Sequence, residues 1–158
     1  SWRNQKGELI MNIKIKYFEE LNTTELYEIL KLRQAVFVVE QNCPYHDIDE
    51  FDPVSVHLML IEGDELVAYA RITEKGTRYP EVSIGRFLVK EDARQKGYGD
   101  KLFSRAIDFI TDDMKEDTIK IQAQTYMRKY YAKKGFKEIS EPYLEDDIEH
   151  VDMLYKKD

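Results

Sequence analysis

The stretch that decides the fold is Glu81–Ile110, with the sequence EVSIGRFLVKEDARQKGYGDKLFSRAIDFI. Its first part, Val82–Val89, is a mostly apolar, β-prone run, which predicts a strand. Leu102, Ala106 and Ile110 then recur at helical spacing with charged residues between them, which predicts a helix. A short charged segment joins the two elements, so the stretch is read as strand, loop and helix.

The segment that joins them carries two glycines within Arg94-Gln95-Lys96-Gly97-Tyr98-Gly99. Glycine lets a backbone approach a ligand closely because it has no Cβ. The first N–H groups of a helix lack an internal partner and carry partial positive charge, which suits phosphate oxygens. Glycines at a strand–helix junction also occur in ordinary turns, so this feature alone leaves both interpretations open.

Two known phosphate-binding motifs do not fit this segment. A P-loop needs Gly-Lys-Ser/Thr, and Gly99-Asp100-Lys101 does not supply it. A Rossmann fingerprint needs G-x-G-x-x-G directly after the strand. Here seven residues separate Val89 from Gly97, and Leu102 stands where a third glycine would be.

Three segments together resemble one family. Arg94, Gly97 and Gly99 match R/Q-x-x-G-x-G/A, the acetyl-CoA motif of the GNAT N-acetyltransferases. Tyr130–Phe136 (YYAKKGF) resembles the F-Y-x-x-x-G-F segment of that family. Leu32–Tyr45 (LRQAVFVVEQNCPY) is similar to its ElaA-type branch, and the resemblance as a whole extends from about residue 12 to residue 155.

The resemblance implies an α/β (α+β) fold, the GNAT fold, in which helices flank a mixed, strongly twisted sheet of six to seven strands. Residues 11–158 are expected to form a single domain, and residues 1–10 to be a remnant or disordered segment outside it. Sequence patterns predict three helices, which begin at Asn22, after Gly99 and at Tyr126. The expected strands are Ile13–Phe18, His57–Ile61, Glu65–Ile72, Val82–Val89, Thr118–Gln124, Phe136–Ile139 and His150–Tyr155.

Composition excludes several classes of protein. With 42% hydrophobic and 35% charged residues in 158, the chain is expected to be one soluble globular domain. No apolar run approaches the ~20 residues of a membrane span, so no membrane partner is expected. The net charge of −7 argues against a nucleic-acid binder. Cys43 is the single cysteine, which allows a reducing compartment, and the cytoplasm is the expected location.

The resemblance implies acetyl-CoA as the cofactor, and direct acetyl transfer from the thioester to a primary amine of a small molecule or peptide. No metal is expected, and family members often form homodimers through sheet edges. Coenzyme A is an anion, so a local cluster of lysines and arginines around the motif segments, Arg94 included, is expected to offset the acidic net charge. The cofactor-binding residues that the resemblance implies are Phe87, Leu88, Val89, Arg94, Gln95, Lys96, Gly97, Tyr98, Gly99, Asp100 and Gln124.

The same resemblance assigns the general acid to Tyr131, four residues before Gly135. A phenol of ordinary pKa ~10 suits protonation of a thiolate of pKa ~8.5. The alternative is that Tyr131 is only a packed aromatic side chain in a helix. Tyr130 is expected to be the core member of the pair. Main-chain N–H groups of the strand that ends at Val89 are the expected donors to the developing oxyanion.

The general base is the least defined role. Some family members carry a glutamate at the position of Ser83, and this chain departs there. Glu81 lies two residues away on the same face of the strand by alternation, so it is the candidate base, acting through water. His57, Glu40 and His150 are rivals, and an amine of lowered pKa needs no base.

The long segment between Glu40 and Ser55 is rich in aspartate and glutamate, Asp49 among them. It is either a solvated loop or a wall that attracts a cationic amine. The candidate substrate-binding residues are Glu40, Asp49, His57 and Ser83. Two other functions stay open: a non-catalytic acyl-CoA-binding module or sensor, and an interaction domain that has lost the cofactor.

Overall fold

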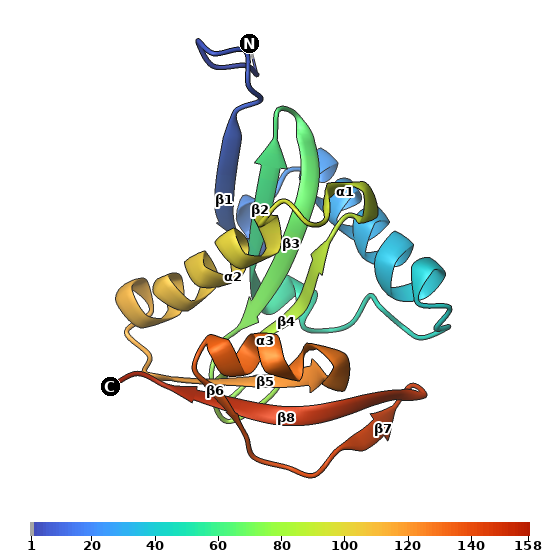
Figure 1. Ribbon diagram of the computed structural model, residues 1–158, viewed down its shortest axis with the longest axis vertical. Helices are drawn as coiled ribbons and strands as arrows, with labels where there is room; N and C mark the ends of the chain where they lie inside the picture. Colours follow the sequence, from blue (N-terminus) through green and yellow to red (C-terminus); the bar gives the residue numbers. More distant parts are fainter. Residues whose placement is uncertain (1) are drawn as a thin grey trace.

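The computed structural model describes residues 2–158 (Figure 1). Within them, eight strands form one mixed sheet in the order β1-β2-β3-β4-β5-β8-β6, with β7 paired to β8. The strands are β1 (Met11–Tyr17), β2 (Ser55–Glu62), β3 (Glu65–Thr73), β4 (Val82–Val89), β5 (Thr118–Gln124), β6 (Phe136–Glu138), β7 (Tyr143–Glu145) and β8 (Ile148–Lys156). The helices are α1 (Thr23–Arg33), α2 (Tyr98–Asp108) and α3 (Arg128–Lys133).

This architecture confirms the expected mixed α/β fold and the expected order of elements. The one additional strand is β7, a three-residue strand in what was predicted to be a polar loop. Its neighbours Asp146 and Asp147 both have positive φ, at 52° and 60°, and form the turn into β8. No glycine marks this turn, which is why the sequence did not reveal the hairpin.

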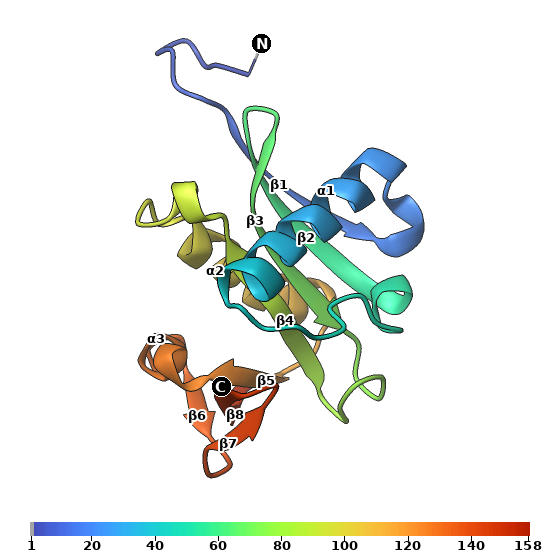
Figure 2. The same ribbon diagram turned by 90° about the vertical axis from the view of Figure 1, so that its right-hand side faces the viewer.

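Helices α1 and α2 cover opposite faces of the sheet, as Figure 2 shows. Along β2, Leu58 and Leu60 join the core formed with α2, whereas Met59 joins the core formed with α1. Successive side chains of a strand point to opposite faces, so one strand supplies both cores. Strands β2 and β3 are consequently buried along most of their length.

Helix α1 begins where the sequence predicted. The Asn22 side chain accepts a hydrogen bond from the Glu25 amide at 2.7 Å, and the Glu25 carboxylate accepts one from the Asn22 amide at 3.0 Å. This capping box satisfies two N–H groups that a helix start leaves free. Beyond Arg33 the chain continues through a π-helical turn, Gln34–Glu40, and so carries Glu40 and Gln41 toward β4.

Strands β4 and β5 pair in parallel only at Val82–Ile119 and Ser83–Lys120, and then diverge (Figure 2). The edge of β4 that faces β5 is therefore unpaired from Ile84 onward within the described chain. Beside this opening, Tyr69 pairs with Leu88 and Arg71 pairs with Gly85, so β4 has one more residue than β3 between the two pairs. Arg86, in this stretch of β4, has a φ of 51°. This is a β-bulge, a feature that turns side chains in new directions and often lies next to binding sites.

The acidic segment after Glu40 is not a solvated loop. Asp47 and Asp52 are buried, and the fully buried guanidinium of Arg33 donates to both, at 2.9 Å and 2.7 Å. Arg71 donates to Asp52 at 2.9 Å and to Asp49 at 2.7 Å. Buried charges require such pairing. The segment is thus fastened to α1 and β3, and its aspartates are neutralised by arginines instead of facing an amine.

Residues 2–10 form a turn that lies against the β2–β3 hairpin. The Ile10 amide donates to the Trp2 carbonyl at 2.6 Å, and the Gly63 amide donates to the Ile10 carbonyl at 2.9 Å. Within the described chain, no helix is long and apolar enough to cross a membrane.

Candidate functional site

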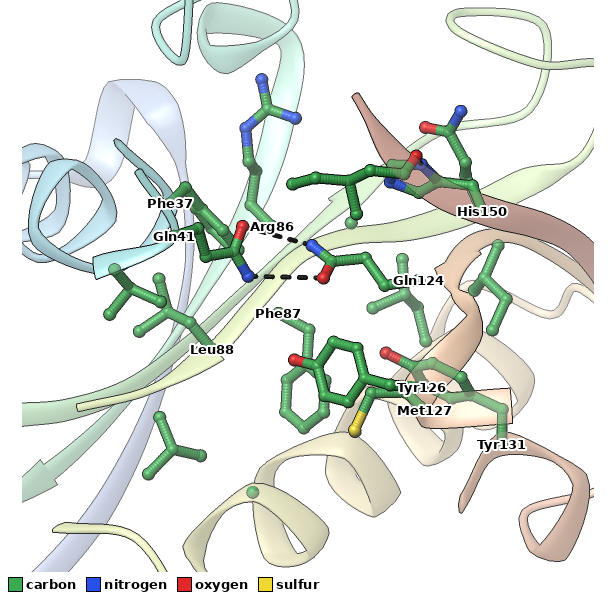
Figure 3. A pocket seen from close by; sticks show the side chains of 18 of the residues that line it. Phe37, Gln41, Arg86, Phe87, Leu88, Gln124, Tyr126, Met127, Tyr131 and His150 are labelled. Carbon is green, nitrogen blue, oxygen red and sulfur yellow. Dashed lines mark hydrogen bonds between the residues drawn. The ribbon is translucent and has the colours of Figure 1, made fainter. Parts of the chain in front are cut away.

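A cavity of about 630 Å³ lies where β4 and β5 separate. Its walls come from β4, β5 and β8, the loop before α2, the start of α3 and the segment from Val36 to His46. Figure 3 shows Phe37, Gln41 and Leu88 on one side of it and Tyr126, Met127 and Tyr131 on the other. Because alternate N–H and C=O groups of a strand point toward each edge, the unpaired edge of β4 presents main-chain donors to this cavity.

The loop before α2 presents further donors. The main-chain N–H groups of Gln95 to Asp100 donate to no acceptor within residues 2–158, and the first helical bond runs from the Lys101 amide to the Gly97 carbonyl at 3.1 Å. Gly97 has a φ of +79°, in the left-handed region that favours glycine, and a Cβ there would meet no heavy atom within 4 Å. Free donors at a helix start are suited to an anion such as a diphosphate.

The second glycine has a different role. A Cβ on Gly99 would lie 3.0 Å from Val89 Cγ2 and 3.3 Å from Phe87 Cζ. Gly99 therefore allows α2 to pack closely on β4, which brings the helix start to the unpaired strand edge. Both glycines line the cavity, and Gly99 has this packing role in addition.

Arg94 does not offer a free charge to a phosphate. Its guanidinium donates to Glu40 at 2.8 Å and to the Val89 carbonyl at 3.0 Å. The hydrogen bond from Arg94 lowers the pKa of Glu40, so this carboxylate stays ionised and paired. The pair fastens the end of the π-helical turn to the loop before α2. Both residues line the cavity, but as partners of each other.

Other predicted cations are also paired. Lys90 bonds Glu65, and Lys134 lies 2.6 Å from Asp100, which also accepts from the Tyr130 hydroxyl at 2.9 Å. Lys96 is not among the described residues that line the cavity; its Nζ lies 5.9 Å from the centre of the Tyr98 ring. The main-chain donors are consequently the main feature of this wall that favours an anion.

Tyr131 lies at the inner end of the cavity. Its side chain is 9% exposed and packs against Phe103 and Phe136, yet its hydroxyl has no hydrogen-bond partner in the described chain. Burial, with a smaller effect from Tyr126, raises the pKa of Tyr131. The hydroxyl therefore stays protonated and is free to donate. The expectation that Tyr130 is the core member of the pair is wrong, since Tyr130 is less buried and bonds Asp100.

A pair of amide side chains spans the cavity. The Gln41 Nε2 donates to Gln124 Oε1 at 3.4 Å, and the Gln124 Nε2 donates to Gln41 Oε1 at 3.3 Å, as the dashed lines in Figure 3 show. Gln124 lies at the end of β5, and Gln41 follows the π-helical turn. The bond joins the two separated halves of the sheet across the opening. Sequence analysis had noted Gln124 but had no means of finding its partner, 83 residues away.

Besides Lys96, three other predicted site residues are absent from the described lining of the cavity. His57 is fully buried, with its ring nitrogens bonded to the Tyr69 hydroxyl at 2.6 Å and the Asp52 carbonyl at 2.9 Å. Asp49 is held by Arg71 and Arg86. Glu81 precedes β4 at the end of the strand remote from the helix start. Ser83, in contrast, is buried and lines the cavity.

His150 lines the cavity from β8 (Figure 3). Its Nδ1 lies 2.7 Å from the Ile148 carbonyl, which can only accept, so Nδ1 carries a proton, and Nε2 has no hydrogen-bond partner in the described chain. Arg78, Tyr79 and Gln122 also line the cavity and were not foreseen. They come from a turn and a strand face whose sequence pattern is ordinary, so only the spatial arrangement identifies them.

Comparison with known proteins gives consistent results. The model of the acetyltransferase (GNAT) domain family matches residues 22–157. A UPF0039 protein of Schizosaccharomyces pombe is 43% identical, over 87% of this chain and 92% of its own. Protein ElaA of Escherichia coli strain K12 is 40% identical, over 87% of this chain and 91% of its own.

Solved structures agree with the sequence relatives. The crystal structure of Escherichia coli ElaA superimposes with a TM-score of 0.86 at 36% identity, covering 92% of this chain and 99% of that one. An acyl-CoA N-acyltransferase from Pseudomonas aeruginosa has the same TM-score and identity, covering 91% of this chain and 99% of that one. The chain therefore belongs to the GNAT acetyltransferase family and, within it, to the ElaA-type branch.

Proposed function

We propose that this protein is an acetyl-CoA-dependent N-acetyltransferase that transfers the acetyl group directly to a primary amine. The observation that carries the proposal is one cavity that contains both the free N–H groups of Gln95–Asp100 and the unpartnered hydroxyl of Tyr131. Membership of the GNAT family supports acyltransferase chemistry. Family membership does not by itself specify which acyl group is transferred or what accepts it; an acetyl group and a primary amine are what we propose.

The residues present fit coenzyme A. A diphosphate needs closely spaced donors and no side chain in the way, and the loop at Gly97 supplies both conditions. The unpaired edge of β4 at Phe87, Leu88 and Val89 offers main-chain groups along which an extended arm could lie. When bound, acetyl-CoA supplies an activated thioester, and the chain supplies positioning, an oxyanion site and proton handling.

Main-chain N–H groups of β4 would bind the carbonyl oxygen of the thioester as negative charge develops on it. They are held in place by the sheet before the reaction, so no reorganisation is required. The β-bulge at Arg86 interrupts the regular pairing of β4 with β3 beside this part of the strand.

Tyr131 would donate a hydrogen bond to the leaving sulfur. Since burial raises the pKa of Tyr131, complete proton transfer to a thiolate of pKa ~8.5 is unfavourable at equilibrium. Its contribution is therefore a fixed hydrogen bond that stabilises the thiolate as the C–S bond breaks. The Nε2 of His150, which also lines the cavity, would accept a proton from the acceptor amine, a role for which imidazole is the commonest side chain.

The test is Tyr131→Phe, measured by release of coenzyme A thiol from acetyl-CoA with a broad panel of amines. Loss of one preorganised hydrogen-bond donor to developing negative charge typically lowers kcat ~10²–10³-fold, and turnover should fall by about this factor while the affinity for coenzyme A stays unchanged. Tyr130→Phe is the matched control, because that hydroxyl bonds Asp100 and should matter little. Equal turnover of the Tyr131→Phe variant and the wild type would contradict the role of the hydroxyl.

A second function is an acyl-CoA-binding module or sensor without turnover. It is favoured by Ser83, which stands where some family members carry a glutamate, and by the pairing of Glu40 with Arg94. Tight binding of acetyl-CoA with no thiol release for any amine in the panel would support this alternative. Thiol release with any amine removes it.

A further inference from the structure

The cavity has a second half that the proposed cofactor site does not use. The loop before α2 and the aromatic side chains of α3 line one half, and the other half is lined by Arg78, Tyr79, Ser83, Gly85 and Gln122. An acceptor must approach the thioester from this second half, because the first is taken by the diphosphate and its arm. The charges in the second half therefore bear on what the acceptor is.

Arg78 is the notable charge there. Its guanidinium forms no ion pair with a carboxylate of the described chain; it donates to Gln122 Oε1 at 3.3 Å and lies 5.1 Å from the centre of the Tyr79 ring. The other arginines lining the cavity, Arg86 and Arg94, are each held by carboxylates. A guanidinium is always charged and presents a planar fork of donors that matches a carboxylate.

The structure holds Arg78 in position over β4. A Cβ on Gly85 would lie 3.9 Å from Arg78 Nη1, so the guanidinium lies beside the strand where that residue has no side chain. The turn that carries Arg78 is closed by a 2.8 Å bond from the Gly76 amide to the Tyr79 carbonyl. Lys120 Nζ, 3.7 Å from the centre of the Tyr79 ring, packs on the same aromatic ring. The Arg78 guanidinium is thus held in this position without a bound ligand.

Two exposed acidic groups line the rim of this half. They are Glu145, the last residue of β7, and Asp146, which follows it in the turn, and Glu145 accepts a hydrogen bond from the Gln122 side chain to which Arg78 also donates. Solvated carboxylates at the rim favour approach of an ammonium group. Arg78 would repel a second ammonium group bound near it, whereas it would form an ion pair with a carboxylate. An acceptor with one amine and one carboxylate is therefore complementary to both the acidic rim and Arg78.

We propose that the acceptor is a primary amine that also carries a carboxylate, as an amino acid does, and that Arg78 binds the carboxylate. This inference rests on the proposed acetyl transfer. Gln122, which accepts from the guanidinium, and Ser83, which lines the same cavity, would orient the same end of the molecule. The amine is then directed along β4 toward Phe87 and Leu88, where the thioester carbonyl would lie.

The test uses pairs of amines that differ only in the carboxylate: L-leucine and 3-methylbutylamine, L-phenylalanine and 2-phenylethylamine, L-lysine and 1,5-diaminopentane. Thiol release is measured at saturating acetyl-CoA for the wild type, Arg78→Gln and Arg78→Lys. Comparison of each variant with the wild type on the same amine cancels differences in amine basicity. Lys75→Gln is the matched control, since it removes a charge from the same turn outside the cavity.

We expect wild-type preference for the carboxylate-bearing member of at least one pair. Arg78→Gln should raise the KM for that amino acid by at least ~10-fold with little change in kcat, as expected when a charged hydrogen-bond donor to the ligand is lost. Arg78→Lys should restore part of the loss, and Lys75→Gln should behave as the wild type.

Two results would overturn the inference while leaving acetyl transfer intact. One is a wild type that acetylates the decarboxylated amines as efficiently as the amino acids. The other is an Arg78→Gln variant that changes KM equally for both members of a pair. Absence of thiol release with every amine, despite calorimetric binding of coenzyme A, would instead refute the proposed function and this inference with it.

Discussion

A single methyl group on Gly97 should weaken coenzyme A binding strongly. Gly97 has a φ of +79° and a ψ of 8°, a left-handed conformation that costs about 1–2 kcal/mol for a residue with a Cβ. A Cβ at this position meets nothing within 4 Å, so the cost of Gly97→Ala is conformational rather than steric. If the loop relaxes to avoid it, the N–H groups of Gln95–Asp100 no longer converge.

The expected loss follows from this cost. If holding the loop in the binding conformation requires about 1–2 kcal/mol more, the Kd for coenzyme A rises about 5- to 30-fold. If the loop stays in place, the methyl group projects into the space where the diphosphate would lie, and the affinity falls for that reason. In either case, isothermal titration calorimetry should give a higher Kd for coenzyme A with Gly97→Ala than with the wild type.

A matched control exists within the chain. Gly7 also has a φ of +79° and an open surrounding for a Cβ, but it lies in the turn formed by residues 2–10. Gly7→Ala should leave coenzyme A affinity unchanged. The reasoning is refuted if Gly97→Ala binds coenzyme A as the wild type does, or if both variants lose affinity equally.

Three further changes test the framework around the site. Gly99→Ala places a Cβ 3.0 Å from Val89 Cγ2 and should lower stability by about 1–3 kcal/mol, seen as a lower Tm; an unchanged Tm would show that the contact relaxes freely. Arg33→Met removes the buried arginine that donates to both Asp47 and Asp52, which keep only Arg86 and Arg71, and should cost about 3–5 kcal/mol in urea unfolding, so a variant of wild-type stability would contradict the importance of the pairing. Burial raises the pKa of Asp52, but the hydrogen bonds and charges of Arg33 and Arg71 outweigh it and lower the pKa below its ordinary value. The stabilisation is therefore complete above the ordinary pKa of ~3.9 and is lost as the pH falls through the lower folded value, so urea unfolding at decreasing pH should show declining stability below about pH 4, and a flat profile would oppose this pairing.

The sequence alone determined the features that depend on neighbours along the chain. The strand, loop and helix of Glu81–Ile110 followed from the spacing of apolar residues, and the start of α1 followed from Asn22 and Glu25. Gly97 at the helix start was identified as a point of close backbone approach, and the structure adds that it adopts the left-handed conformation. The sequence pattern also predicted the helix that carries Tyr131, which the structure confirms in outline, and the family resemblance supplied the role proposed for its hydroxyl.

Only the tertiary structure decided which of these residues are free to act. Glu40 and Arg94 each looked like a ligand-binding charge, and they bind each other across 54 residues of chain. The aspartates of the acidic segment are neutralised by arginines of other elements, and Glu81 and His57 lie outside the described lining of the cavity. The separation of β4 from β5, which creates the cavity, and the position of Arg78 over Gly85 likewise depend on how distant segments pack. A sequence shows which groups a chain carries, but the free energy of a charge depends on its partners and burial, and these are set when remote segments meet.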